Sequence, residues 1–247
     1  MLSQLLAKRT RPISIDFVER RPSWMAQGLR SRMILRRPPC HTAVEQQARA
    51  SQRVGPRPIW AGYASVENYP RSPVGDRTSD EVRTDADTGA FYTWLVCQRR
   101  PSAIVEFGTA FGISSMYWLG GLEQVGEGHL FTFEPNANWA EIAEVNLKTI
   151  SDRYTLTVGT FEDNAEIVLK GTSVSVAFVD AIHTSDFVFS QYEILSAFLA
   201  PGGIVLFDDI NFSEDMQVCW AEIAHRPEVA ASAVIGGRVG MIEIQTD

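Results

Sequence analysis

The stretch Ala103-Ile-Val-Glu-Phe-Gly-Thr-Ala-Phe-Gly-Ile-Ser-Ser115 decides how the rest of the chain is interpreted. Its first residues are mostly apolar, which is typical of a parallel strand buried on both faces. Gly108 and Gly112 then predict a tight turn into a helix that begins near Ile113. The free backbone N–H groups of such a turn are expected to face a ligand. The glycine spacing is not the G-x-G-x-x-G of dinucleotide-binding turns, which argues against a pyrophosphate ligand.

After this turn, apolar segments of strand length alternate with helical patterns. Such an alternation predicts an α/β protein with a parallel sheet covered by helices on both faces. The last two apolar segments are joined by Gly236-Gly237, which predicts an antiparallel hairpin at the end of the sheet. The expected strands are 103–107, 129–133, 155–158, 175–179, 204–207, 231–235 and 239–244. The expected helices between them are 113–122, 138–150, 163–169, 185–199 and 214–224.

The sequence before residue 103 gives weaker signals. Thr78-Ser-Asp-Glu81 is a helix start, and the apolar residues after it predict one helix that ends at Arg99-Arg100-Pro101. Residues 61–79 are predicted to be a loop, and any helix in residues 1–60 is expected to be short, over 17–34 with an interruption at Pro22. We therefore expect a partly ordered N-terminal extension, residues 1–78, before a single domain, residues 79–247.

Charge is distributed unevenly along the 247 residues. Residues 1–60 hold 12 of the 22 Lys and Arg residues but only three of the 30 Asp and Glu residues. The acidic remainder is a poor match for nucleic acid. The basic beginning admits several interpretations: a transit-like segment, a partner-binding arm, a contact in a homodimer, or a start codon assigned too early. The simplest alternative is a partly ordered arm that takes no part in binding or catalysis.

Two further features concern the compartment. No apolar run approaches the roughly 20 residues that a membrane-spanning helix needs, and the N-terminus lacks the apolar core of a secretory signal. The three cysteines are far apart and odd in number, which fits neither a disulfide framework nor a zinc site. These features predict a cytoplasmic protein that does not associate with membranes.

Five motifs follow one another along the chain: V-E-F-G-T-A-F-G-I-S-S from 105, F-T-F-E-P from 131, V-G-T-F-E from 158, F-V-D-A-I-H from 178 and L-A-P-G-G-I-V-L-F-D-D from 199. In this order they resemble the motifs of class I S-adenosylmethionine-dependent methyltransferases, nearest to metal-dependent O-methyltransferases of small molecules. The resemblance covers about residues 80–245. It implies a Rossmann-like sheet of seven mostly parallel strands in the order 3-2-1-4-5-7-6. S-adenosylmethionine is then expected across the carboxyl ends of strands 1 to 4, where open α/β sheets bind ligands.

The resemblance assigns cofactor-binding roles along these motifs. Glu134 closes the second strand, where a carboxylate can accept hydrogen bonds from both ribose hydroxyls. Its alternative role is to cap the next helix. Phe161 is expected to stack on adenine, or to be an ordinary core residue. Ser114 would donate to the methionine carboxylate or simply cap its helix. The remaining predicted cofactor-binding residues are Glu106 in a supporting role, Gly108, Thr109, Gly112, Thr160 and Asp180.

Three acids are expected to meet at the carboxyl ends of adjacent strands 4 and 5. Asp180, Asp208 and Asp209 would repel each other unless a cation lay among them, and carboxylate oxygens suit Mg²⁺ or a similar divalent ion. Such an ion would lower the pKa of an acceptor hydroxyl and orient its oxygen. The resemblance therefore implies a metal site here, with Asn211 as an optional ligand. The alternative is that Asp180 contacts only the cofactor and the other two acids cap a helix.

His183 stands where the resembling enzymes carry a basic lysine or another base. A neutral imidazole there can take the acceptor's proton, so His183 and Asp180 are the predicted catalytic residues. His183 and Ile182 depart from the common patterns and leave the acceptor class open. The expected function is methyl transfer to a hydroxyl of a small molecule. The alternatives are a metal-independent N- or O-methyltransferase, and a non-catalytic module that binds S-adenosylmethionine and acts through its N-terminal arm.

Overall fold

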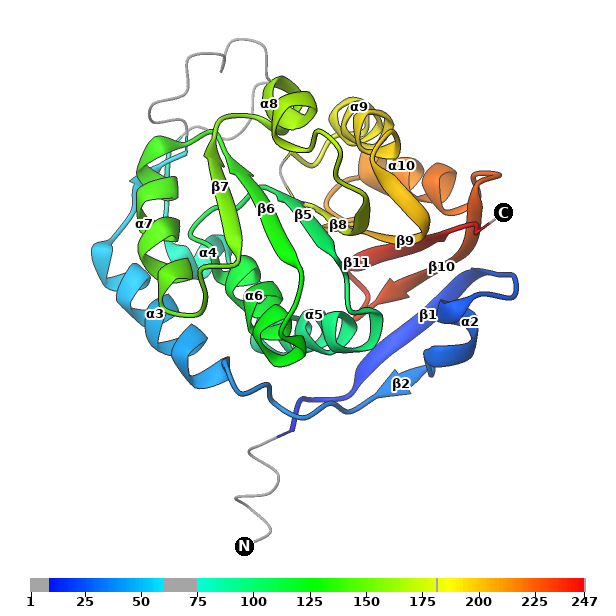
Figure 1. Ribbon diagram of the computed structural model, residues 1–247, viewed down its shortest axis with the longest axis horizontal. Coiled ribbons are helices and arrows are strands. Elements are labelled where there is room, and N and C mark those ends of the chain that lie inside the picture. The colour runs from blue at the N-terminus through cyan, green and yellow to red at the C-terminus, as the bar shows by residue number, and fades with distance from the viewer. Residues whose placement is uncertain (1–8, 60–74, 181, 247) are drawn as a thin grey trace, which may run out of the picture.

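The protein is described by a computed structural model that covers residues 9–59, 75–180 and 182–246. Within these residues one sheet of nine strands carries the fold, in the order β2-β1-β10-β11-β9-β8-β5-β6-β7, with a separate two-stranded ribbon of β3 and β4 (Figure 1). The nine strands are β1 Ile13–Arg20, β2 Arg32–Met33, β5 Ala103–Phe107, β6 His129–Glu134, β7 Tyr154–Val158, β8 Val174–Val179, β9 Leu199–Phe207, β10 Val229–Ile235 and β11 Val239–Ile244. The ribbon consists of β3 Arg57–Pro58 and β4 Asp76–Arg77.

The seven expected strands are all present and lie in the expected order. Neighbours from β7 to β9 pair in parallel, whereas β11 pairs antiparallel with β9 and with β10. The predicted α/β class and closing hairpin are thus confirmed. Because the chain reverses after β10, the turn between β10 and β11 lies beside the carboxyl end of β9.

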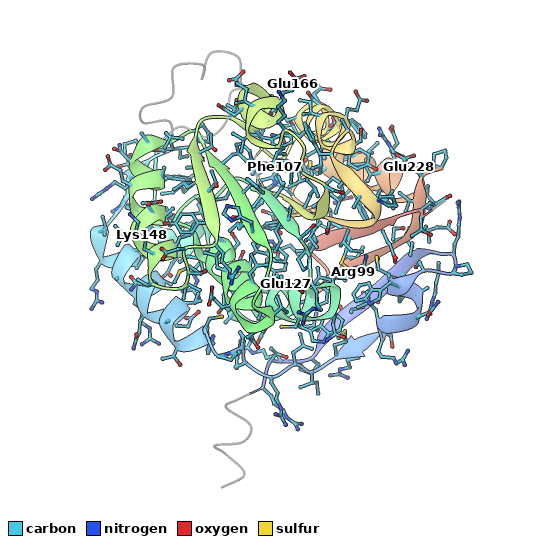
Figure 2. The ribbon with its side chains drawn as sticks, in the orientation of Figure 1. Arg99, Phe107, Glu127, Lys148, Glu166 and Glu228 are labelled. Atoms are coloured by element: carbon cyan, nitrogen blue, oxygen red, sulfur yellow. The ribbon has the colours of Figure 1, made fainter. Side chains whose placement is uncertain are left out.

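Helices cover both faces of the sheet (Figure 1). They are α2 Trp24–Gly28, α3 His41–Val54, α4 Ser79–Val82, α5 Ala86–Arg99, α6 Ile113–Val125, α7 Ala137–Lys148, α8 Phe161–Val168, α9 Ser185–Ser196 and α10 Glu214–Ala224. The side chains of successive strand residues pack into two apolar cores, one on each face of the sheet. Ile104 of β5 packs into the core with α3, α5, α6 and α7, and its neighbour Val105 packs into the core with α8, α9 and α10. Figure 2 shows Phe107 of β5 in the interior, whereas Glu166 and Lys148 lie at the periphery.

The helix predicted from residue 79 to residue 99 is in fact two helices. The backbone of Arg83 is extended, and Asp85 begins α5 by accepting hydrogen bonds from the backbone N–H groups of Asp87 and Thr88. The second cap separates a four-residue α4 from α5. The apolar spacing was compatible with one continuous helix, but the break brings Arg83 and Thr84 over the carboxyl edge of the sheet.

Of the helix predicted over residues 17–34 only α2 is present, and the 14-residue α3 contradicts the expectation that any helix in residues 1–60 is short. Alternating exposed and buried side chains make 13–20 a strand, with Ile15 only 1% exposed. This strand, β1, pairs antiparallel with β10 and adds to the seven expected strands at their hairpin edge. The basic beginning of the chain therefore contributes a strand to the main sheet. Residues 61–74 of the predicted loop lie outside the described residues.

Candidate active site

The turn after β5 is held by its own backbone. Gly108 has φ +94°, as a glycine was expected to permit. However, the N–H groups of Gly108 and Thr109 both donate to the carbonyl oxygen of Phe133, and that of Gly112 donates to Thr109. The prediction that these N–H groups are free for a ligand is thus wrong. Because Gly112 gives α6 no side-chain cap, the donors that remain are those of the first turn of α6.

A glycine is required at position 112 by the packing of α6 against α7, which is not the reason expected from the sequence. It has φ +80°, and a Cβ atom added there would lie 2.5 Å from Cδ1 of Leu147 and 3.3 Å from Cα of Ala143. The absent side chain therefore lets α7 approach the start of α6. Its part in admitting a ligand stays a prediction.

A cleft opens over this turn. It is open to solvent and is bounded by two groups of residues. From the sheet side come Gly108, Thr109, Ala110, Phe111, Ile113, Ser114 and Asp180. From α4 and the break after it come Ser79, Val82, Arg83 and Thr84. The structure thus brings four of the predicted site residues, Gly108, Thr109, Ser114 and Asp180, around one cavity.

Glu134 lies at the end of β6 and faces the turn. Its Oε2 accepts the N–H of Ala110 at 2.7 Å, and its Oε1 accepts the N–H of Asn136 at 2.8 Å. Ala110 has φ +48°, so the carboxylate helps to hold an unfavourable backbone conformation. Each oxygen keeps a lone pair for a further donor. Burial raises the pKa of Glu134 to about 7.

Glu106 supports the turn from beneath it. The side chain is fully buried, and its Oε2 accepts hydrogen bonds from the hydroxyls of Ser115 and Thr132. Thr132 in turn lies 2.6 Å from the hydroxyl of Thr109. Burial raises the pKa of Glu106. This position below the cleft is consistent with the supporting role expected of Glu106.

The predicted stacking role of Phe161 is not supported. Its ring is 1% exposed and stacks on Phe107, with ring centroids 4.3 Å apart, inside the apolar core. Thr160 caps α8, because its hydroxyl accepts the N–H of Asp163 and donates to the carboxylate of Asp163. A phenylalanine after a strand serves the core as readily as a ligand, so the sequence could not separate the two roles. The part of Thr160 in binding a cofactor stays a prediction.

The expected cluster of acids is present, and a cation lies within it. Arg238, from the turn before β11, donates to both oxygens of Asp208 at 3.1 and 2.6 Å. Its Nε also lies 2.7 Å from Oδ1 of Asp209. Burial and the adjacent Asp208 raise the pKa of Asp180 well above its usual range, whereas the two carboxylates raise that of Arg238.

A divalent ion does not fit the three acids in this arrangement. Both oxygens of Asp208, which is only 5% exposed, accept hydrogen bonds from the guanidinium of Arg238, whose positive charge would repel a second cation there. The amide nitrogen of Asn211, the optional ligand, donates to the backbone oxygen of Gly237 at 2.5 Å. No group of three or more His, Cys, Asp or Glu side chains within 9–59, 75–180 and 182–246 is placed to hold a metal. Arg238 thus lies beside two of the three acids predicted to hold a metal, and the metal site of Asp180, Asp208 and Asp209 stays a prediction.

His183 lies at the edge of this cluster. Its Nε2 is 3.9 Å from Oδ1 of Asp180 and 3.7 Å from Oδ2 of Asp209, and its ring packs beside Phe212. Burial lowers the pKa of His183. The imidazole is therefore neutral at neutral pH, and the two carboxylates beside it can stabilise the charge that a captured proton brings.

Sequence reasoning missed Arg238 and the residues after α4. A signal for Arg238 was available, since Gly236-Gly237-Arg238 forms the turn of a hairpin whose second strand was expected beside strand 5. The signal for Arg83 and Thr84 is Asp85, an acid that can cap a second helix and so end the first one before it.

Comparisons with known proteins relate the chain to methyltransferases. Residues 105–210 match the family model described as a methyltransferase domain. No curated protein matches the chain significantly. Within the described residues no helix has the length and apolarity to traverse a bilayer.

Several solved structures share the fold. The O-methyltransferase TomG from Streptomyces achromogenes, involved in tomaymycin synthesis and solved with SAM, is 18% identical over 82% of this chain and 89% of its own, with a TM-score of 0.61. An O-methyltransferase from Bacillus cereus in complex with SAH is 19% identical over 83% and 91%, with a TM-score of 0.59. A putative caffeoyl-CoA O-methyltransferase from Staphylococcus aureus is 21% identical over 67% and 87%, with a TM-score of 0.56.

Proposed function

We propose that the chain is a class I S-adenosylmethionine-dependent methyltransferase and that it methylates a hydroxyl group of a small molecule. The observation that carries the proposal is Glu134. This buried carboxylate bridges the end of β6 and the turn after β5, and each of its oxygens can accept one more hydrogen bond. A pair of ribose hydroxyls provides the matching donors. The O-methyltransferases of similar fold support the choice of a hydroxyl acceptor.

The proposed cofactor site runs from Glu134 along the cleft to Asp180. Glu134 would bind the ribose, and Ser114 and the first turn of α6 would bind the carboxylate of the methionine part. Asp180 would accept from its amine. Bound S-adenosylmethionine would supply a methyl group on a positively charged sulfur.

His183 is the proposed general base. Its neutral imidazole would take the proton of the acceptor hydroxyl as the oxygen forms its bond to the methyl carbon and the carbon–sulfur bond breaks. Asp180 and Asp209 would stabilise the resulting imidazolium from 3.9 and 3.7 Å. No step requires a metal. The acceptor would enter beside α4 and the break at Arg83 and Thr84, which bound the cleft opposite the glycine turn.

Two measurements test this function. Isothermal titration of the full chain with S-adenosylhomocysteine should give heat and one site per chain; no heat would contradict the cofactor assignment. Transfer of a labelled methyl group is then compared for a phenol and for the aniline that differs from it only in the reacting atom. The phenol should be the better acceptor, and preference for the aniline would overturn the hydroxyl assignment.

A further inference from the structure

The acids at the carboxyl ends of β8 and β9 are neutralised by the protein itself. Asp208 receives two hydrogen bonds from Arg238, and Asp209 forms an ion pair with the same guanidinium. A guanidinium matches carboxylates geometrically and stays charged at all relevant pH values. The repulsion between these acids is therefore relieved without any bound ion.

The backbone of Arg238 is held as firmly as its side chain. Its N–H donates to the oxygen of Ile235, and its own oxygen accepts the N–H of Ile210, each at 3.2 Å. Asn211 fixes the preceding Gly237 through its side-chain amide. Gly236 donates to Ser14, which precedes Ile15 in β1. The guanidinium is thus anchored by the loop after β9 and by the first strand of the chain.

We propose that Arg238 is a built-in cation that takes the place of a divalent ion beside Asp208 and Asp209, so that this chain transfers methyl groups without a metal. The inference rests on the proposed function for its reaction, but its binding test does not. A divalent ion at Asp208 would be repelled by the adjacent guanidinium, and moving Arg238 away would break two hydrogen bonds and leave its partly buried charge unpaired. Arg238 is accordingly a positioning residue, since it acts through the two carboxylates.

Manganese binding tests the proposal. Mn²⁺ has the same preference for oxygen ligands as Mg²⁺ and is detected by the loss of the electron paramagnetic resonance signal of the free ion. The full-length wild-type chain, without added cofactor, should leave millimolar Mn²⁺ free. Arg238→Met keeps the length of the side chain but frees the acids, so it should bind Mn²⁺ about tenfold or more tightly than the wild type.

Matched variants make the result specific. Arg238→Lys keeps the charge and should not bind Mn²⁺. Arg100→Met removes an exposed ion pair with Glu127, far along the sequence from the acids, and should behave as the wild type. Adding Asp208→Asn to Arg238→Met should abolish the acquired binding. Circular dichroism checks that each variant is folded, and the Mn²⁺ and EDTA measurements on the wild type preserve the test should the methionine variant fail to fold.

Three outcomes would overturn the proposal. One is Mn²⁺ binding by the wild type that Asp208→Asn removes. Another is no Mn²⁺ binding by folded Arg238→Met, since the acids would then not be a site for a cation. Methyl transfer by the wild type in EDTA should equal that in Mg²⁺, and a loss in EDTA would also contradict the proposal. An inactive chain that shows the expected Mn²⁺ pattern would instead count against the proposed function alone.

Discussion

Glu134 has to be ionised to accept two ribose hydroxyls while it holds the turn. Because burial raises its pKa to about 7, the carboxyl is mostly protonated at pH 6 and mostly ionised at pH 8. Affinity for S-adenosylhomocysteine should therefore rise with pH, by about tenfold from pH 6 to pH 8. Titration calorimetry at the two pH values measures this change.

Substituting this one carboxylate gives a second measure of its role. Glu134→Gln should weaken S-adenosylhomocysteine binding by about ten- to a hundredfold, as expected for a lost hydrogen bond to a charged group, and should remove the pH dependence. The matched control is Glu166→Gln, an exposed position on α8 (Figure 2), which should change neither. Equal affinities of the two variants would contradict the ribose-binding role.

His183 is expected to affect the reaction and not cofactor binding. His183→Gln should lower kcat by about a hundredfold to ten-thousandfold, the range that general base catalysis contributes. Its affinity for S-adenosylhomocysteine should stay at the wild-type value. His225→Gln is the control, because His225 caps the end of α10 and its Nδ1 lies 2.7 Å from the oxygen of Ala221. A kcat within a few-fold of the wild type for His183→Gln would exclude it as the base.

At the scale of elements, the contact between α6 and α7 depends on one missing side chain. Gly112→Ala should lower the free energy of unfolding by about 1–3 kcal/mol more than Gly126→Ala, because only the first introduces a steric overlap. Both glycines have positive φ, but a Cβ atom at Gly126 would meet nothing within 4 Å. The free energies of unfolding of the two variants, measured in urea, therefore distinguish the steric overlap at Gly112 from the backbone strain that both alanines share.

A compensating change provides the control for this interpretation. Leu147→Ala removes the atom that the new Cβ would meet. The double variant Gly112→Ala/Leu147→Ala should therefore lose less stability than the sum of the losses of the two single variants. Additive losses in the double variant would show that the overlap with Leu147 is not the cause.

At the scale of the whole molecule, the sequence predicted what periodicity and turn residues encode. The order of seven strands, the hairpin at Gly236-Gly237 and the acids at Asp180 and Asp208 could all be inferred. What could not be inferred depends on tertiary contacts. Phe161 suits the core and a ligand equally, and Arg238 meets the acids only because β11 lies beside β9. Likewise, β1 finds its place only because β10 offers a free edge.

The N-terminal segment also satisfies a buried carboxylate of the main sheet. The N-terminus of α2, after β1, is held by Glu243 of β11, whose oxygens accept the N–H groups of Trp24 and Met25 at 3.0 and 2.7 Å. Glu243 is 3% exposed, so loss of this segment would leave a buried carboxylate without partners. The postulated dimer through the N-terminal arm stays a prediction, and it has to allow for β1 pairing with β10 of its own chain.

A pair of isoleucines tests whether the N-terminal segment belongs to the folded core. Ile15 in β1 is 1% exposed, whereas Ile34 after β2 is 56% exposed. Ile15→Ala should lower the free energy of unfolding by about 2–5 kcal/mol, as in other buried positions, and Ile34→Ala by less than about 0.5 kcal/mol. Urea unfolding monitored by circular dichroism measures both. Equal, small effects would mean that residues 13–20 do not stabilise the sheet, and the anchoring of the Arg238 turn through Ser14 and Gly236 would then lose its physical basis.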